Sequence, residues 1–212
     1  MRVSVITIAK TKEELGPLRE ILKKQTYKDF EFVYSTRKGI PQAWNDAIMK
    51  AKGEILLITE SDVMPLSNRW IEDMVGAAIE NGDKAVVRGI EVIPSPWCFS
   101  NLACYSKILK ANKLDESYPV GEDTELFSRL NDMGYKGVEL SISPVLHIRK
   151  FKGFFKEVKN AYLYGKFNTR TNRRYQKLSF NQNPKVQNIL IRELTTIISR
   201  VAFMIGIIRG LS

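Results

Sequence analysis

Residues 53–62, Gly-Glu-Ile-Leu-Leu-Ile-Thr-Glu-Ser-Asp, contain the stretch that decides the fold. Between Glu54 and Thr59 the apolar side chains follow one another without alternating with polar ones. A strand of this kind is typical of a parallel sheet that helices cover on both faces, because both sides of each strand are then buried. We therefore predict a buried strand here, with two carboxylates, Glu60 and Asp62, directly after it.

Strands and helices alternate on both sides of this buried strand. The capping-box spacing of residues 11–14 predicts the start of a helix that runs to Lys24, although Pro17 could instead be its first residue. The other predicted elements are the strands Val3–Ala9, Phe30–Tyr34 and Ala85–Val92 and the helices Trp70–Ile79 and Pro41–Lys52, the latter with Gly53 as its C-cap. This order predicts an α/β fold of the Rossmann-like kind, with a mostly parallel central sheet flanked by helices.

The second half of the chain is less regular but continues this pattern. We expect a helix around Leu102–Lys110, an amphipathic helix that begins near Glu122, and a strand near Gly137–Ile142 that leads to His147. The sequence contains neither GxGxxG nor GxxxxGK[ST], so no dinucleotide fingerprint or P-loop accompanies the α/β pattern. Ligands of such sheets bind beyond the carboxyl ends of the strands, which directs the search for a site to residues 10–12, 35–39 and 60–63.

The charge of the chain is unevenly distributed. Of the 212 residues, with a net charge of +10, residues 149–212 contain 14 Lys and Arg against only Glu157 and Glu193. We therefore predict an α/β domain over residues 1–148 and a basic, helical C-terminal extension over residues 149–212. Cys98 and Cys104 do not form a CxxC motif, and no signal peptide is recognisable before Lys10, so we expect a cytoplasmic protein.

The basic extension leaves several interpretations open. Cations alternate with aromatic residues over residues 149–166, a pattern that suits a solvated covering helix, an anionic membrane surface or, as the least favoured reading, single-stranded nucleic acid. Apolar residues then recur at helical spacing from Ile189 to Ile208, but Arg192, Glu193 and Arg200 interrupt them too often for a spanning helix. A helix that docks on the body would show the same stripe, yet the sequence favours peripheral attachment to a membrane.

Two groups of residues could form a functional site, judged from their residue types and positions alone. Glu60 and Asp62 follow the buried strand, where paired carboxylates suit a hard divalent cation, although an acidic turn without a metal is common. His147 is the only histidine, and a lone histidine is more often structural than a ligand, but its position after a strand could bring it to the same site. Glu122 and Asp123 lie in the first turn of a helix, whose dipole favours ionised carboxylates, so they could form a cap or a general base.

The order of these motifs resembles glycosyltransferase family 2. The resemblance covers residues 3–148 and rests on the following segments: Thr11 to Glu14, Gln25 to Phe32, Gly39 with Ala43-Trp44-Asn45, Ala51 to Glu54, Glu60-Ser61-Asp62 with Pro65, Gly121-Glu122-Asp123-Thr124, and His147. It implies the GT-A fold and an inverting transfer of a sugar from a nucleotide-linked donor to an acceptor hydroxyl. Donors linked to UDP, GDP or dTDP are compatible with it, as are glycan and lipid-linked acceptors.

The resemblance also implies roles for individual residues. Asp123 would be the base that deprotonates the acceptor, and Glu122 would bind the acceptor or cap the helix. Asp62, with His147 as a second ligand, would hold Mn²⁺ or Mg²⁺ on the diphosphate. The donor would contact the remaining residues, with Glu60 facing the ribose or a metal-bound water: Ala9, Thr11, Tyr34, Gly39, Asn45, Glu60 and Ser61.

Three positions depart from the family pattern. Tyr34-Ser35-Thr36 stands where family members carry acidic residues that read the base, Trp44 stands where an arginine is usual, and Glu60 replaces the first Asp of the metal motif. Tyr34 could stack on a base instead. These departures keep an alternative open, a sugar-nucleotide-binding protein without turnover that its tail recruits to membranes or RNA. Nucleotidyl transfer is disfavoured because no glycine follows the first strand.

Overall fold

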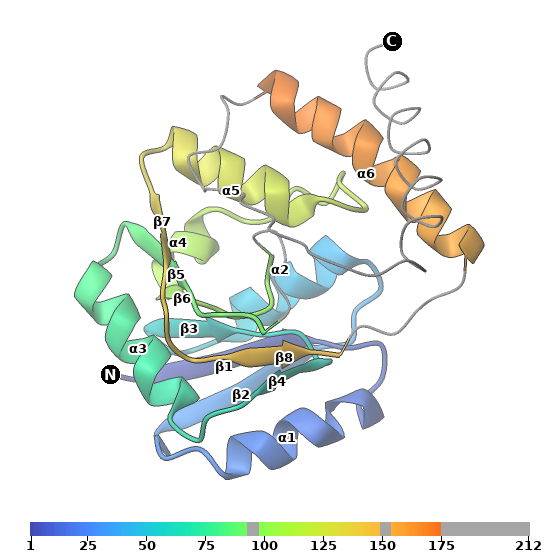
Figure 1. Cartoon of the computed structure of the whole chain (residues 1–212). Helices are drawn as coiled ribbons and strands as arrows, with labels where there is room; N and C mark the ends of the chain where they lie inside the picture. The colour runs from blue at the N-terminus through green and yellow to red at the C-terminus, as the bar shows by residue number, and fades with distance from the viewer. Residues whose placement is uncertain (93–97, 149–153, 175–212) are drawn as a thin grey trace.

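The computed structural model describes residues 1–92, 98–148 and 154–174. A central sheet with helices on both faces dominates the molecule (Figure 1). The strands are β1 Val3–Ile8, β2 Phe30–Ser35, β3 Ile55–Ile58, β4 Val63–Pro65, β5 Ala85–Arg88, β6 Leu102–Tyr105, β7 Lys136–Glu139 and β8 Val145–His147. The helices are the 3₁₀ turn η1 Glu13–Leu15 and α1 Gly16–Lys23, α2 Ile40–Lys50, α3 Trp70–Asn81, α4 Ser106–Ala111, α5 Glu122–Asp132 and α6 Phe154–Arg174.

The central sheet has six strands in the order β2-β1-β3-β6-β5-β7. β1 runs parallel to β2 and β3, and β5 runs parallel to β7, whereas β6 is antiparallel to both of its neighbours. β4 and β8 form a separate antiparallel pair. The α/β fold with a mostly parallel, helix-flanked sheet is thus confirmed.

The buried strand β3 explains why the sheet needs helices on both faces. Its side chains alternate between two hydrophobic clusters, with Leu56 and Ile58 in one and Ile55 and Leu57 in the other. The first cluster includes residues of α2, α4 and α5, and the second includes residues of α1 and α3. All four strand residues are fully buried, as the unbroken apolar run predicts.

Several predicted boundaries were wrong. The segment expected to be a helix from Leu102 to Lys110 is half strand, β6, and only then helix, α4. The helix expected to end at Gly53 ends at Lys50 with Ala51 as its C-cap. Gly53 serves another purpose, because a Cβ atom there would lie 2.5 Å from the backbone nitrogen of Ser4. β5 ends at Arg88 rather than at Val92.

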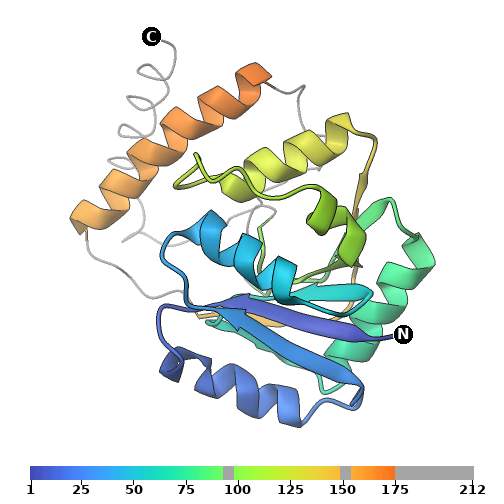
Figure 2. The ribbon, with the colours of Figure 1, turned by 180° about the vertical axis from the view of Figure 1, so that it is seen from behind.

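The first part of the C-terminal extension is the helix α6, which packs beside α5 (Figure 2). The ring of Phe167 lies 5.4 Å from the ring of Tyr118, and the Arg170 guanidinium lies 4.7 Å above the same ring. Tyr118 is fully buried and precedes the segment that leads into α5. The boundary at residues 148 and 149 stays a prediction, but α6 itself is attached to the body.

Part of the extension lies outside the described residues. This part includes the basic residues 149–153 and the apolar stripe predicted from Ile189 to Ile208. Among the helices that the structure describes, none is both long enough and apolar enough to cross a membrane.

Candidate functional site

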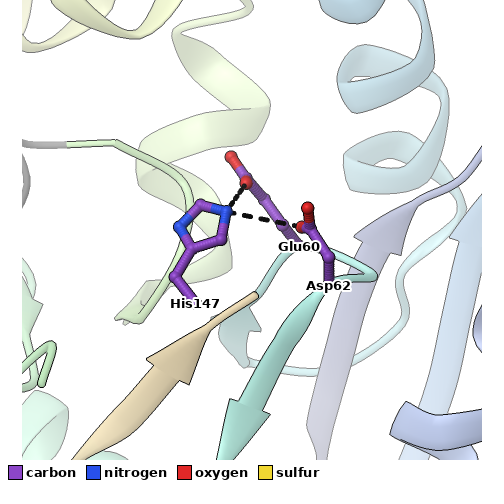
Figure 3. Close-up of side chains that lie close together, drawn as sticks. All are labelled: Glu60, Asp62 and His147. Carbon is purple, nitrogen blue, oxygen red and sulfur yellow. Dashed lines mark ion pairs between the residues drawn. The ribbon is translucent and has the colours of Figure 1, made fainter. Parts of the chain in front are cut away.

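The loop after β3 and the end of β8 bring three predicted residues together. Glu60 and Asp62 lie between β3 and β4, and His147 is the last residue of β8, where it pairs with Val63 of β4. The His147 Nε2 atom lies 3.1 Å from Glu60 Oε2 and 3.5 Å from Asp62 Oδ1 (Figure 3). One ligand atom from each of the three residues lies within 4.8 Å of the others. We call these residues the strand-end triad.

The triad has the composition of a divalent metal site. Two carboxylates and an imidazole suit Mn²⁺, and the carboxylates also suit Mg²⁺. The Glu60 side chain is 32% exposed and that of Asp62 47%, so an ion could reach them from solvent. Burial lowers the pKa of His147, but the hydrogen bonds and negative charges of Asp62 and Glu60 outweigh it and raise the pKa to about 9. The imidazole therefore carries a proton at neutral pH and holds the two carboxylates together where a cation would stand.

A second acidic group lies at the start of α5. Gly121 is the N-cap and has a φ of 73°, a left-handed conformation that glycine adopts without strain. Glu122 is only 8% exposed, and Asp123 is half-buried and accepts a hydrogen bond of 2.7 Å from the Thr124 backbone N–H. We call Glu122 and Asp123 the helix-mouth pair.

Burial changes the protonation of the helix-mouth pair. It raises the pKa of Glu122 to about 8, with the charge of Asp123 as the next cause. It also raises the pKa of Asp123 to about 6; the Thr124 N–H opposes this rise and the charge of Glu60 adds to it. The sequence suggested that the helix dipole would keep such carboxylates ionised. At neutral pH a pKa of about 6 leaves Asp123 ionised, whereas Glu122, with a pKa of about 8, is protonated because its desolvation outweighs the dipole. The charge of Glu60 acts on Asp123, so the pair lies within electrostatic range of the triad.

Tyr164 of α6 was not predicted as a site residue. Burial and the negative charges of Asp123, Glu122 and Glu60 raise the pKa of its hydroxyl well above the usual range. Tyr164 is nevertheless 43% exposed, and its hydroxyl lies within electrostatic range of the same carboxylates, while α6 is held in place through Phe167 and Arg170. The only signal in the sequence was the mixture of aromatic and basic residues, which we interpreted as a surface.

Several residues predicted to contact the donor lie at the carboxyl ends of β1, β2 and β3. Ala9 follows β1 and donates its backbone N–H to the Ser35 carbonyl at 3.1 Å. Thr11 and Gly39 are exposed, and Ser61 is half-buried in the turn of the triad. Tyr34 is half-buried, with the Arg19 guanidinium 5.2 Å above its ring. Because β1, β2 and β3 are parallel, these residues follow strands that end at the same edge of the sheet.

Asn45 has a structural use that the sequence did not reveal. Its side-chain amide is buried and donates to the Leu114 carbonyl at 3.0 Å and to Glu116 Oε1 at 3.1 Å. Its Oδ1 accepts a hydrogen bond of 2.9 Å from the Leu114 N–H. The amide thus ties α2 to the loop after α4. Next to it, Trp44 is buried against Phe99, with ring centroids 4.9 Å apart, and so belongs to the core.

The comparisons with known proteins agree on the kind of protein. The family model for glycosyl transferase family 2 matches residues 10–113, about half of the chain. No curated protein sequence matches.

Solved structures share the fold at low sequence identity. One is the mannosyltransferase PcManGT from Pyrobaculum calidifontis in complex with GDP-Man and Mn²⁺, with a TM-score of 0.70 and 14% identity over 99% of this chain and 74% of that one. Another is S. aureus TarS 1-349, with a TM-score of 0.56 and 12% identity over 98% of this chain and 81% of that one. A mycobacterial protein matches 81% of this chain and 75% of its own, with a TM-score of 0.58 and 13% identity.

Proposed function

Because this chain belongs to glycosyltransferase family 2 and has the GT-A fold, we propose that it is an inverting glycosyltransferase. It moves a sugar from a nucleotide-sugar donor to an acceptor hydroxyl. The observation that carries the proposal is the strand-end triad at the carboxyl end of β3, supported by an acidic helix-mouth pair close enough for the charge of Glu60 to raise the pKa of Asp123.

In this proposal Asp123 is the general base. Its raised pKa of about 6 lies close to neutrality, which suits a group that must accept a proton from the acceptor hydroxyl. The Thr124 N–H holds Oδ1 in a defined orientation. Glu122, with a pKa raised to about 8, stays protonated at neutral pH and can donate a hydrogen bond to the acceptor. The two carboxylates thus have different protonation states and different tasks.

Asp62 and His147, with Glu60 beside them, hold Mn²⁺ or Mg²⁺ in this proposal. The fit rests on the donor set, because carboxylate oxygens and an imidazole lie close enough to share one ion. When bound, such an ion offsets the negative charge that develops on the departing diphosphate. His147 must lose its proton before it can act as a ligand.

The donor lies along the carboxyl ends of β1, β2 and β3. We assign it to Ala9, Thr11, Tyr34, Gly39 and Ser61, where the parallel strands end. The GDP-Man of the similar mannosyltransferase supports a nucleoside diphosphate sugar, with UDP, GDP or dTDP as the carrier. Asn45 is left out of this assignment because protein groups occupy its amide.

The acceptor is a glycan or lipid-linked molecule at the face of α5 and α6. Tyr164 of α6 lies within electrostatic range of Asp123 and Glu122, which supports an acceptor hydroxyl on this side of the site. The basic composition of residues 149–212 supports an enzyme on the cytoplasmic face of a membrane that carries such an acceptor.

A panel of UDP-, GDP- and dTDP-sugars tests the proposal, with thermal unfolding measured in Mn²⁺, in Mg²⁺ and in chelator. A ligand that binds only the folded chain raises its unfolding temperature by mass action. We expect one nucleotide series to raise it, more strongly with metal than in chelator, and a matching release of nucleotide in a turnover assay. Stabilisation without any release of nucleotide would favour a binding protein instead, and no stabilisation by any donor would contradict the proposal.

A further inference from the structure

The small β4–β8 sheet has one apolar face in the core and a second apolar face that points outward. Val63, Val145 and His147 are buried, and the two valines belong to a core cluster. The intervening residues point the other way: Leu66 is 55% exposed and Ile148 46% exposed. An antiparallel pair with one face against water normally alternates apolar and polar residues, so an apolar outward face needs an explanation.

Residues 90–92 extend this face. Glu91 is buried and aligned in parallel with Val145 of β8, and the Val92 N–H donates to the Val145 carbonyl at 3.0 Å. Ile90, at 41% exposed, and Val92, at 53%, therefore project on the outer side. The residues of this side, which we call the outer apolar face, are Met64, Leu66, Ile90, Val92, Leu146 and Ile148.

In the described part of the chain the outer apolar face is continuous; four of its residues are exposed, whereas Met64 and Leu146 are half-buried. Met64 pairs directly with Leu146, and the Ile148 N–H donates to the Asp62 carbonyl at 2.8 Å, so the side chains lie on adjacent strands. In Figure 1 both strands lie in front of the central sheet, and no helix among the described residues crosses in front of them. Continuous apolar surface of this kind marks a site of interaction rather than ordinary scatter.

The charge of the neighbouring sequence favours one kind of partner. Ile148 is followed directly by Arg149 and Lys150, with Lys152 and Lys156 soon after and Phe151, Phe154 and Phe155 among them. A surface that is apolar inside and negatively charged outside would satisfy both features, because side chains such as Leu66 enter the acyl boundary while cations meet the headgroups. Nucleic acid would leave the apolar side chains without a partner.

We propose that the outer apolar face docks on an anionic lipid membrane. This inference adds a partner to the proposed function and rests on it only for the acceptor. Along β8 the side chains alternate between two sides. His147 of the strand-end triad points inward, between Leu146 and Ile148 of the outer apolar face. Docking would therefore leave the strand-end triad on the side of β8 that faces away from the lipid, so a lipid-linked acceptor would reach it around the edge of the β4–β8 sheet, toward α5 and α6.

Flotation of the full chain with vesicles rich in phosphatidylglycerol tests the inference, in chelator so that divalent ions cannot bridge protein and lipid. We expect binding to these vesicles and little binding to phosphatidylcholine alone. The double substitution Leu66→Glu with Val92→Glu should reduce binding by about tenfold or more, because two apolar side chains no longer enter the bilayer. A gentler pair, Leu66→Ser with Val92→Ser, covers the case in which the charged pair fails to fold.

A matched control uses Met49→Glu with Met133→Glu, two methionines that are 51% and 58% exposed on α2 and after α5. This variant should bind vesicles like the unaltered chain. Equal binding by the face variants and the control, or no binding by the unaltered chain, would overturn the inference. A dimer of the unaltered chain in sedimentation, lost in the face variants but not in the control, would also overturn the inference, because the face would then join two copies. Donor turnover without vesicles is measured in parallel, so loss of vesicle binding with turnover intact separates this inference from the proposed function.

Discussion

The strand-end triad and the helix-mouth pair contain the same carboxylate chemistry in opposite surroundings. Glu60 and Asp62 are a third to a half exposed and share a protonated His147. Glu122 is nearly buried, and burial raises its pKa and that of Asp123. The triad gathers negative charge, which the proton on His147 balances and which a bound cation could balance instead. In the pair, burial brings the pKa of a carboxyl group close to neutral pH.

The difference shows how one site can hold two kinds of acid. In the proposed function, exposure of the triad's carboxylates would let an ion enter and leave, while burial of the pair would prepare a group to take a proton. In the triad the imidazole comes from a strand far along the chain, whereas the pair is formed by neighbouring residues. The following predictions test this contrast.

The largest effect is expected at the helix-mouth pair. Asp123→Asn should lower kcat by about 10²–10⁴-fold, because a general base contributes about that much, while donor binding measured by calorimetry stays unchanged. Asp132→Asn, at the other end of α5, is the matched control and should leave kcat as it is. Full activity of Asp123→Asn would show that the pair only caps the helix.

Substitutions in the strand-end triad should weaken metal binding rather than proton transfer. His147→Ala should weaken Mn²⁺ binding by about tenfold to a hundredfold or more. Removal of a residue that only hydrogen-bonds to a metal ligand already lowers metal affinity by about that factor, and His147 is a proposed ligand itself. Isothermal titration with Mn²⁺ measures the change. The control Asp83→Asn alters an exposed carboxylate that pairs with Lys107 away from the triad. Equal Mn²⁺ affinity in both variants would remove His147 from the ligand set.

The pH dependence of metal binding should reflect the raised pKa of His147. The protonated imidazole, with a pKa of about 9, cannot bind a cation, so Mn²⁺ affinity should rise about tenfold per pH unit from neutrality and level off near that value. His147→Ala should flatten this slope. An affinity independent of pH in the unaltered chain would mean that the imidazole does not bind the ion.

The Asp123 carboxyl should titrate at a lower pH than the His147 imidazole. The base must be ionised to act, so kcat/KM should fall about tenfold per unit below about pH 6, following the raised pKa of Asp123, and should level off between that value and about pH 8, where Glu122 loses its proton. Steady-state rates at saturating metal measure this limb. A limb near the ordinary pKa of an aspartic acid would indicate that burial does not control the group.

The smallest effect concerns the glycine before the pair. Gly121→Ala should cost about 1 kcal/mol of the free energy of unfolding, because a side chain disfavours its φ of 73°. Gly76→Ala, within α3 and with open space for a Cβ, should instead gain about 0.5–1 kcal/mol. Chemical denaturation of both variants checks the opposite signs, and a loss of the same size in both would contradict the conformational argument.

The sequence predicted the parts of the fold in which local pattern and burial agree. The unbroken apolar run of β3 and the alternation around it were enough to predict a parallel sheet with helices on both faces. β6 was missed because Leu102 to Tyr105 continues directly into the helix α4, so a single apolar stretch contains two elements. Only pairing with β3 and β5 decides where the strand ends.

The candidate site was predicted unevenly for a similar reason. Glu60, Asp62 and Asp123 stand beside recognisable strand and helix signals. Asn45 belongs to an equally recognisable helix, but its amide binds the loop after α4, which no local pattern reveals. Tyr164 is within electrostatic range of the carboxylates because α6 packs on the body, where Phe167 and Arg170 contact Tyr118.

The sequence by itself determined the α/β class, the order of the main elements and the identity of the acidic residues, because strand burial, turns and charge leave local patterns along the chain. The tertiary structure decided how these residues act. It placed His147 of β8 against Glu60 and Asp62, and it buried Glu122 deeply enough to keep that carboxyl protonated at neutral pH while the pKa of Asp123 rises only to about 6. Distances and burial depend on contacts between residues far apart in the chain, so no local pattern contains them.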